Sequence, residues 1–181
     1  MQDYDPHATP DVEVAEVLDF LRAHAPFDAL PEPMLQQAAH HLEIEYHRKG
    51  TTVLAIGDAS THLYMVRAGA IELHDDEGTL VARLGEGQYV GYPSLLTGQT
   101  IQRRVRTIED TLLYRLPAAT FDRLRSASDA FDAYFNRAHA ERIRAALTER
   151  RTQRTTLTVP IRTLLRREPV CIAPDASIRA A

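Results

Sequence analysis

Residues 57–106 read GDASTHLYMVRAGAIELHDDEGTLVARLGEGQYVGYPSLLTGQTIQRRVR. Valine, isoleucine, leucine and tyrosine alternate with polar residues in short runs, which is the pattern of half-buried β-strands. Glycines interrupt these runs at intervals near the spacing of about eight to twelve residues that is typical of a small all-β barrel or sandwich. This stretch therefore predicts the core of an antiparallel β-roll.

The pattern extends outward on both sides. Strands are predicted at 43–47, 51–56, 63–68, 70–74, 80–84, 89–90, 102–108 and 112–116. Apolar residues at helical spacing predict helices at 11–23 and 33–42, a helix from Pro117 to Leu124, and a long helix from Ser128 to about Arg151. The expected fold class is α+β: a jelly-roll-like antiparallel β-roll flanked by N-terminal helices and a long C-terminal helix.

The composition is that of a soluble globular protein, with 44% hydrophobic and 25% charged residues in a chain of 181. No apolar run approaches the roughly 18 residues that a membrane span needs. The N-terminus is acidic, unlike a signal peptide, and a single cysteine agrees with a reducing compartment. We expect a cytoplasmic protein without membrane contact.

The long helix carries an apolar stripe that one helix cannot bury alone. It must pack on the β-roll or on a second copy of itself, and the second alternative would make the chain a homodimer. The stripe residues assigned to this interface are Phe131, Tyr134, Phe135, Ala138, Ile143 and Leu147.

The order of strands and turns resembles the cyclic nucleotide-binding domain. The residues that carry the resemblance are Gly57, Asp58, Leu63, Tyr64, Val66, Gly69, Ile71 and Leu73, followed by Gly85, Gly87, Gly91, Leu95, Leu96 and Gly98. The resemblance implies a site in which an arginine and backbone amides meet a cyclic phosphate and a glutamate accepts from the ribose hydroxyl.

Both charged contacts are missing from their expected positions. Alignment without gaps places Gly91 on the family glycine, Tyr92 on the glutamate and Ile101 on the phosphate arginine. No cofactor is required, and the usual cyclic nucleotide is not the favoured ligand. The favoured interpretation is a retained β-roll whose pocket is filled by Tyr92 or left for another small ligand.

Six residues remain as ligand-binding candidates: Gly91, Tyr92, Ser94, Leu95, Arg103 and Arg104. Arg103 or Arg104 could supply the missing charge. A shift of two residues along a strand keeps a side chain on its face, so Arg103 is the better replacement for the residue at Ile101.

Residues 152–158 are polar and predict a linker. Residues 159–181 resemble the opening of a CBS domain and end inside its first helix, which suggests a fragment of a longer protein. The expected organisation is N-terminal helices at 1–42, the cyclic nucleotide-binding-like β-roll at 43–125, a dimer or relay helix at 126–151, the linker, and the truncated CBS start.

This organisation resembles bacterial signal-transduction proteins with cyclic nucleotide-binding-like, CBS and nucleotidyltransferase-like domains. It implies a regulatory sensor and dimerisation module. The alternative is the regulatory part of a nucleotidyltransferase, related to the protein-PII uridylyltransferases, with its catalytic residues beyond residue 181. These 181 residues contain no nucleotidyltransferase, hydrolase or P-loop motif, so the fragment is not expected to be an enzyme.

A transcription factor of the catabolite-activator type is less favoured, because a CBS-like segment stands where that family has its helix-turn-helix. DNA is therefore not an expected partner. A metal site is not expected either. His40, His41 and His47 lack further ligands, and the acidic hairpin 75–78 lacks additional oxygen donors at the spacing of a calcium loop.

Overall fold

The computed structural model describes residues 10–158, and the side chains of residues 14–148. The helices are α1 (Pro10–Ala23), the 3-10 helix η1 (Phe27–Ala29), α2 (Glu32–His41), α3 (Tyr92–Thr97), α4 (Ala118–Ala127) and α5 (Asp129–Thr158). The strands are β1 (Glu43–His47), β2 (Thr52–Leu54), β3 (His62–Ala68), β4 (Ile71–His74), β5 (Leu80–Leu84), β6 (Tyr89–Val90), β7 (Arg104–Thr107) and β8 (Thr111–Pro117).

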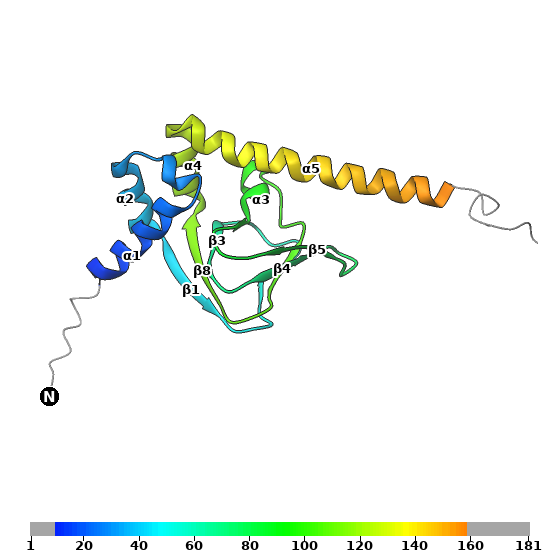
Figure 1. Ribbon diagram of the computed structural model, residues 1–181, viewed down its shortest axis with the longest axis horizontal. Coiled ribbons are helices and arrows are strands. Elements are labelled where there is room, and N and C mark those ends of the chain that lie inside the picture. The colour runs from blue at the N-terminus through cyan, green and yellow to red at the C-terminus, as the bar shows by residue number, and fades with distance from the viewer. Residues whose placement is uncertain (1–9, 159–181) are drawn as a thin grey trace, which may run out of the picture. The chain divides into compact units, whose positions relative to one another are not determined.

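The strands form two antiparallel four-stranded sheets (Figure 1). Sheet A has the order β1-β8-β3-β6, and sheet B has the order β2-β7-β4-β5. Helices precede and follow this roll in the chain, and the last of them is long. The predicted α+β class is confirmed: an antiparallel β-roll with flanking helices and a long C-terminal helix.

Sheet A separates two buried clusters because successive residues of a strand point to opposite faces. Val66 and Leu113, which pair across β3 and β8, belong to one cluster, and the neighbouring pair Met65 and Tyr114 belongs to the other. The first, called the roll cluster, joins residues of both sheets: Leu54, Tyr64, Val66, Ile71, Leu73, Leu84, Val90, Ile101, Val105 and Leu113.

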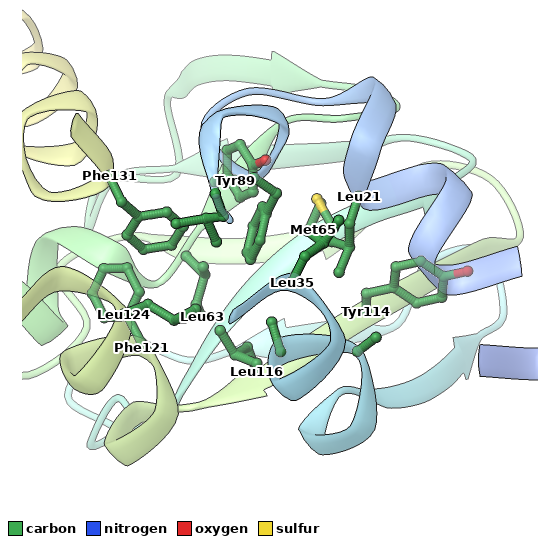
Figure 2. Packing of buried hydrophobic residues seen from close by; sticks show 14 of the residues in the cluster. Leu21, Leu35, Leu63, Met65, Tyr89, Tyr114, Leu116, Phe121, Leu124 and Phe131 are labelled. Atoms are coloured by element: carbon green, nitrogen blue, oxygen red, sulfur yellow. The ribbon is translucent and has the colours of Figure 1, made fainter. Parts of the chain in front are cut away.

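The second cluster, called the helical cluster, packs the helices onto the other face of sheet A (Figure 2). It takes strand residues from β3, β6 and β8 and helix residues from α1, α2, α4 and the first turns of α5. Its largest fully buried side chains are Leu21, Phe27, Leu63, Leu116, Phe121, Leu124, Phe131 and Phe135.

The predicted dimer stripe of α5 divides into a buried and an exposed part. Phe131 and Phe135 are fully buried, with ring centroids 5.1 Å from Phe27 and 5.0 Å from Phe121, respectively. These two residues therefore belong to the core of this chain and not to a surface that a second copy could cover. The exposed large members of the stripe are Tyr134 (37%), Ile143 (48%) and Leu147 (62%).

Two elements differ from the sequence-based expectation. Helix α3 was not predicted, because six residues are too few to show a helical period. Helix α5 continues to Thr158, so the prediction of a linker at 152–158 is wrong. No glycine or proline occurs between Asp129 and Thr158 to end the helix, and polarity alone does not end one.

The chain divides into two compact units, residues 1–139 and residues 140–181. The first contains the β-roll, both buried clusters and the first turns of α5. The predicted CBS-domain start at 159–181 lies outside the described residues. Within residues 10–158, no helix combines the length and the apolar character that crossing a membrane would require.

Candidate functional site

The candidate site is built on α3, whose start is set by Gly91. Gly91 has φ 87°, and a Cβ atom there would lie 2.8 Å from the backbone oxygen of His62. The Ser60 hydroxyl donates to the Gly91 carbonyl at 3.2 Å. Only glycine allows this approach without strain, so α3 begins in direct contact with β3.

The loop after α3 is held by backbone hydrogen bonds. The Ile101 amide donates to the Asp58 carbonyl at 2.8 Å, and the Gly57 amide donates to the Ile101 carbonyl at 2.9 Å. The Ser94 hydroxyl donates to the Thr100 carbonyl at 3.1 Å and ties the helix to its own loop. The backbone of this segment is therefore fixed without a ligand.

Two neutral side chains occupy the positions of the expected charged contacts. Ile101 is 4% exposed and lies in the roll cluster. Tyr92 is 3% exposed and lies in the helical cluster, with its ring centroid 5.3 Å from that of Phe135. The ring of Tyr92 therefore packs among the helices and not in the roll interior, to which Ile101 contributes.

The arginine candidates do not replace the missing charge in the way that strand alternation suggested. Arg104 is the first residue of β7, pairs with His74 and is exposed, while the neighbouring Val105 is buried in the roll cluster. Arg103 precedes the strand in a bend and is half-buried. The rule that two residues share a face holds only within a strand, so it does not place Arg103 in the direction of Ile101.

The six candidates therefore form two groups. Gly91, Tyr92, Ser94 and Leu95 belong to α3 or its start, and Leu95 packs against the helical cluster. Arg103 and Arg104 lie beyond the loop and at the start of β7.

An ionic row beside α3 escaped the sequence reasoning. Glu43, Arg115 and Tyr64 stand opposite one another on β1, β8 and β3. Arg115 Nε donates to Glu43 Oε2 at 2.5 Å, and a second guanidinium nitrogen lies 3.7 Å from Glu45. These carboxylates occupy the guanidinium, so Arg115 is not a free anion ligand. In the sequence, this row was indicated only by residues of opposite charge on predicted strands, and which strands pair is set by the fold.

Burial also perturbs titration at this end of the roll. It raises the pKa of the Tyr64 phenol, and the nearby Glu45 acts in the same direction. Burial also lowers the pKa of His62, and Arg115 adds to that effect. Both groups therefore favour their neutral forms.

Within the described part of the chain, no group of three or more histidine, cysteine, aspartate or glutamate residues could hold a metal ion. His41 Nδ1 lies 2.8 Å from the Gln37 carbonyl, one helical turn away. His47 Nε2 lies 3.4 Å from Glu45 Oε2, and both residues belong to β1.

Residues 44–128 match the family model of the cyclic nucleotide-binding domain. Over these residues the β-roll is similar to that domain. The matched residues include the site described above. In that site Gly91 is the glycine of the family pattern, whereas Tyr92 and Ile101 stand where the pattern has a glutamate and an arginine.

Similarity to known proteins is distant and partial. The cGMP-dependent protein kinase 2 of Mus musculus is 24% identical over 135 residues, covering 67% of this chain and 18% of the kinase. The regulatory domain of Toxoplasma gondii PKA with cAMP superposes with a TM-score of 0.65 at 18% identity, over 72% of this chain and 51% of that chain. The present chain thus spans about half of that structure and a smaller share of the kinase.

A third relative is the regulatory subunit of a cAMP-independent protein kinase A from Trypanosoma brucei. It superposes with a TM-score of 0.57 at 17% identity, over 70% of this chain and 50% of that chain. A triple mutant of the same subunit has cAMP bound in its A site. At this level of identity, both structural likenesses establish the fold.

Proposed function

We propose that this chain is a sensor and dimerisation module of a cytoplasmic bacterial signal-transduction protein, and that its cyclic nucleotide-binding domain has lost the usual ligand contacts. The observation that carries the proposal is the burial of Tyr92 and Ile101 in two different apolar clusters. Neither side chain carries a charge, and neither is free to meet a ribose or a phosphate.

The energetic consequence is large. Removing one partner of a buried, charge-assisted pair costs roughly 2–5 kcal/mol, and about 1.4 kcal/mol corresponds to a factor of ten in affinity. Loss of the phosphate arginine alone weakens a micromolar site by roughly 30-fold or more, and loss of both contacts makes it roughly millimolar or weaker.

The trypanosomal relative supports the proposal by analogy. It has the same fold, is described as part of a cAMP-independent kinase, and has cAMP bound in a triple mutant. The fold is thus compatible with a regulatory role that does not depend on cAMP. The resemblance of residues 159–181 to a CBS domain supports action on further domains of the same protein.

Calorimetric titration of the 181-residue chain with cAMP and with cGMP tests the proposal. We expect no binding at micromolar concentrations. The matched variant Tyr92→Glu/Ile101→Arg puts both family side chains back and is expected to bind at least about tenfold more tightly, because two contacts that are each worth more than a factor of ten outweigh the cost of moving both side chains out of the apolar clusters. Micromolar affinity of the unmodified chain for either nucleotide would overturn the proposal.

A further inference from the structure

Phe135 of α5 is the meeting point of four elements. It is fully buried, and its ring centroid lies between 5.0 and 5.4 Å from those of one residue each in β6, α3 and α4: Tyr89, Tyr92 and Phe121. Aromatic pairs at this spacing interact favourably beyond the burial of their area. The side chain of Phe135 thus contacts Tyr89, which precedes Gly91, and Tyr92, which follows it.

Tyr92 is the part of this contact that α3 contributes. Gly91 holds the first residue of the helix against β3, and Leu95 and Leu96 pack at the border of the helical cluster. Among the residues of α3, Tyr92 alone has a ring packed on Phe135. The position of α3 is therefore linked directly to the position of α5.

The contact depends on a neutral side chain at position 92. A carboxylate beside the ring of Phe135, within the apolar helical cluster, would lose its hydration, which strongly disfavours the charged form. An acidic residue at this position would have to leave the cluster to stay ionised. A tyrosine can stay, because its phenol is uncharged at neutral pH.

We propose that Tyr92 is a positioning residue that ties α3 to α5 without any ligand, so that an intramolecular contact replaces the contact once made to a bound nucleotide. This inference rests on the proposed function, because it assigns a structural role to Tyr92 in a domain that is proposed not to bind a cyclic nucleotide. The tie holds α3 and the first turns of α5 in one arrangement whether or not a small molecule is present.

Hydrogen exchange of the 181-residue chain, measured by mass spectrometry, tests the tie. In Tyr92→Ala we expect amide exchange to become about tenfold faster both in α3 and in residues 131–138, because local opening then breaks fewer contacts. Tyr92→Phe keeps the ring and is expected to stay within about twofold of the unmodified chain. Ser94→Ala is the matched control: it frees the Thr100 carbonyl and should affect residues 92–101 only.

Unchanged exchange at 131–138 in Tyr92→Ala would overturn the proposal. Equal acceleration there in Ser94→Ala would also overturn it, because the effect would then be general destabilisation. Should Tyr92→Ala not fold, Phe135→Leu removes a ring from the other side of the same contact, and unchanged exchange in α3 would contradict the tie. Nucleotide titration is independent of this result: binding by the unmodified chain refutes the proposed function and leaves the exchange pattern to decide the tie.

Discussion

Gly91 sets the position of α3 through its backbone alone. Its φ of 87° is in the region that residues with a side chain avoid, and the space beyond its Cα is taken by the His62 carbonyl. Gly98 ends the same helix with φ 68°, but no atom lies within 4 Å of where its Cβ would be. Both glycines therefore have a positive φ, but only Gly91 also lies where a side chain would collide with neighbouring backbone.

This difference predicts unequal costs for Gly91→Ala and Gly98→Ala. At Gly98 the change adds only the strain of a positive φ, and we expect a loss of about 1 kcal/mol in the free energy of unfolding. At Gly91 the added methyl group also collides with backbone that cannot move freely, and we expect about 3 kcal/mol or more. Urea unfolding measures both, and equal losses would show that the contact with His62 does not constrain α3.

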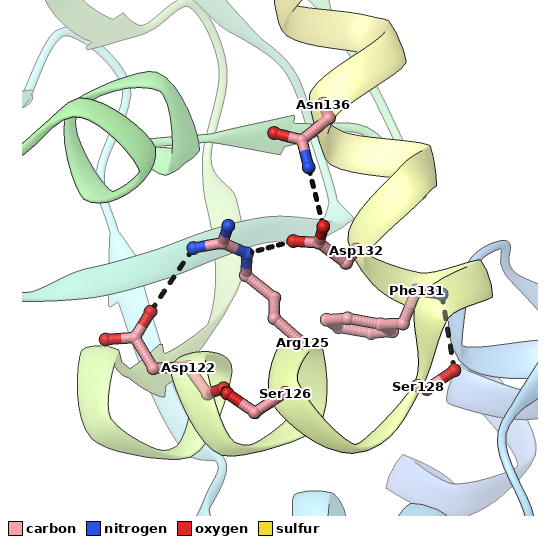
Figure 3. Close-up of polar contacts among 7 residues, drawn as sticks. All are labelled: Asp122, Arg125, Ser126, Ser128, Phe131, Asp132 and Asn136. Carbon is pink, nitrogen blue, oxygen red and sulfur yellow. Dashed lines mark hydrogen bonds and ion pairs between the residues drawn. The ribbon is translucent and has the colours of Figure 1, made fainter.

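Among the elements, the junction between α4 and α5 at Ser128, called the elbow, is held by polar contacts (Figure 3). Arg125 Nε donates to Asp132 Oδ1 at 2.7 Å, and Asn136 Nδ2 donates to Asp132 Oδ2, also at 2.7 Å. Ser128, between the helices, accepts from the Phe131 amide with its hydroxyl at 3.3 Å. These contacts fix where α5 begins, and so how Phe131 enters the core.

Replacing Arg125 by methionine should loosen this elbow. The ion pair is partly exposed, so we expect its loss, together with the loss of the guanidinium stacked 5.5 Å from the Phe121 ring centre, to cost about 1–2 kcal/mol. Arg123→Met is the matched control on the same helix, because Arg123 donates to the neutral hydroxyl of Thr120, and it should cost about 0.5 kcal/mol or less.

Thermal unfolding at low salt and in 1 M NaCl distinguishes the two variants. The difference between Arg125→Met and the unmodified chain should shrink in high salt, since screening weakens the pair that the variant lacks. Equal destabilisation by the two methionine variants would contradict a specific role for the elbow contacts.

At the scale of the whole molecule, the apolar residues of α5 serve two purposes. Phe131 and Phe135 complete the helical cluster, so Phe135→Glu would damage the fold and could not report on association. Ile143, Ala146 and Leu147 follow at helical spacing in the second unit, and Ile143 and Leu147 are exposed. An exposed stripe of this kind is a candidate surface for a second copy of the chain.

We expect Ile143→Glu/Leu147→Glu to convert a dimer into a monomer in analytical ultracentrifugation, because like charges would face each other across a two-fold interface. Arg144→Glu changes the charge of an exposed neighbour without removing an apolar side chain, and should leave the sedimentation mass unchanged. A mass that does not fall in the double variant would contradict this interface.

Much of the architecture was predictable because it depends on local patterns. Within residues 10–158, alternating apolar residues between glycine turns indicated the eight strands, and apolar residues at helical spacing indicated four of the five α-helices. The two unexpected substitutions in the site, Tyr92 and Ile101, were also visible from the alignment of the cassette with the family pattern. Helix α3 was missed because its boundaries depend on two glycine conformations and on contacts with β3.

The β-roll and the neutral residues at positions 92 and 101 follow from the chain alone, since strand period and side-chain charge are local properties. The places of those two side chains depend on the fold, with Ile101 in the roll cluster and Tyr92 against Phe135. The fold also decides that Phe131 and Phe135 belong to this chain's own core. The reason is physical: an apolar stripe specifies that a helix face must be covered, whereas the surface that covers it depends on segments distant in sequence.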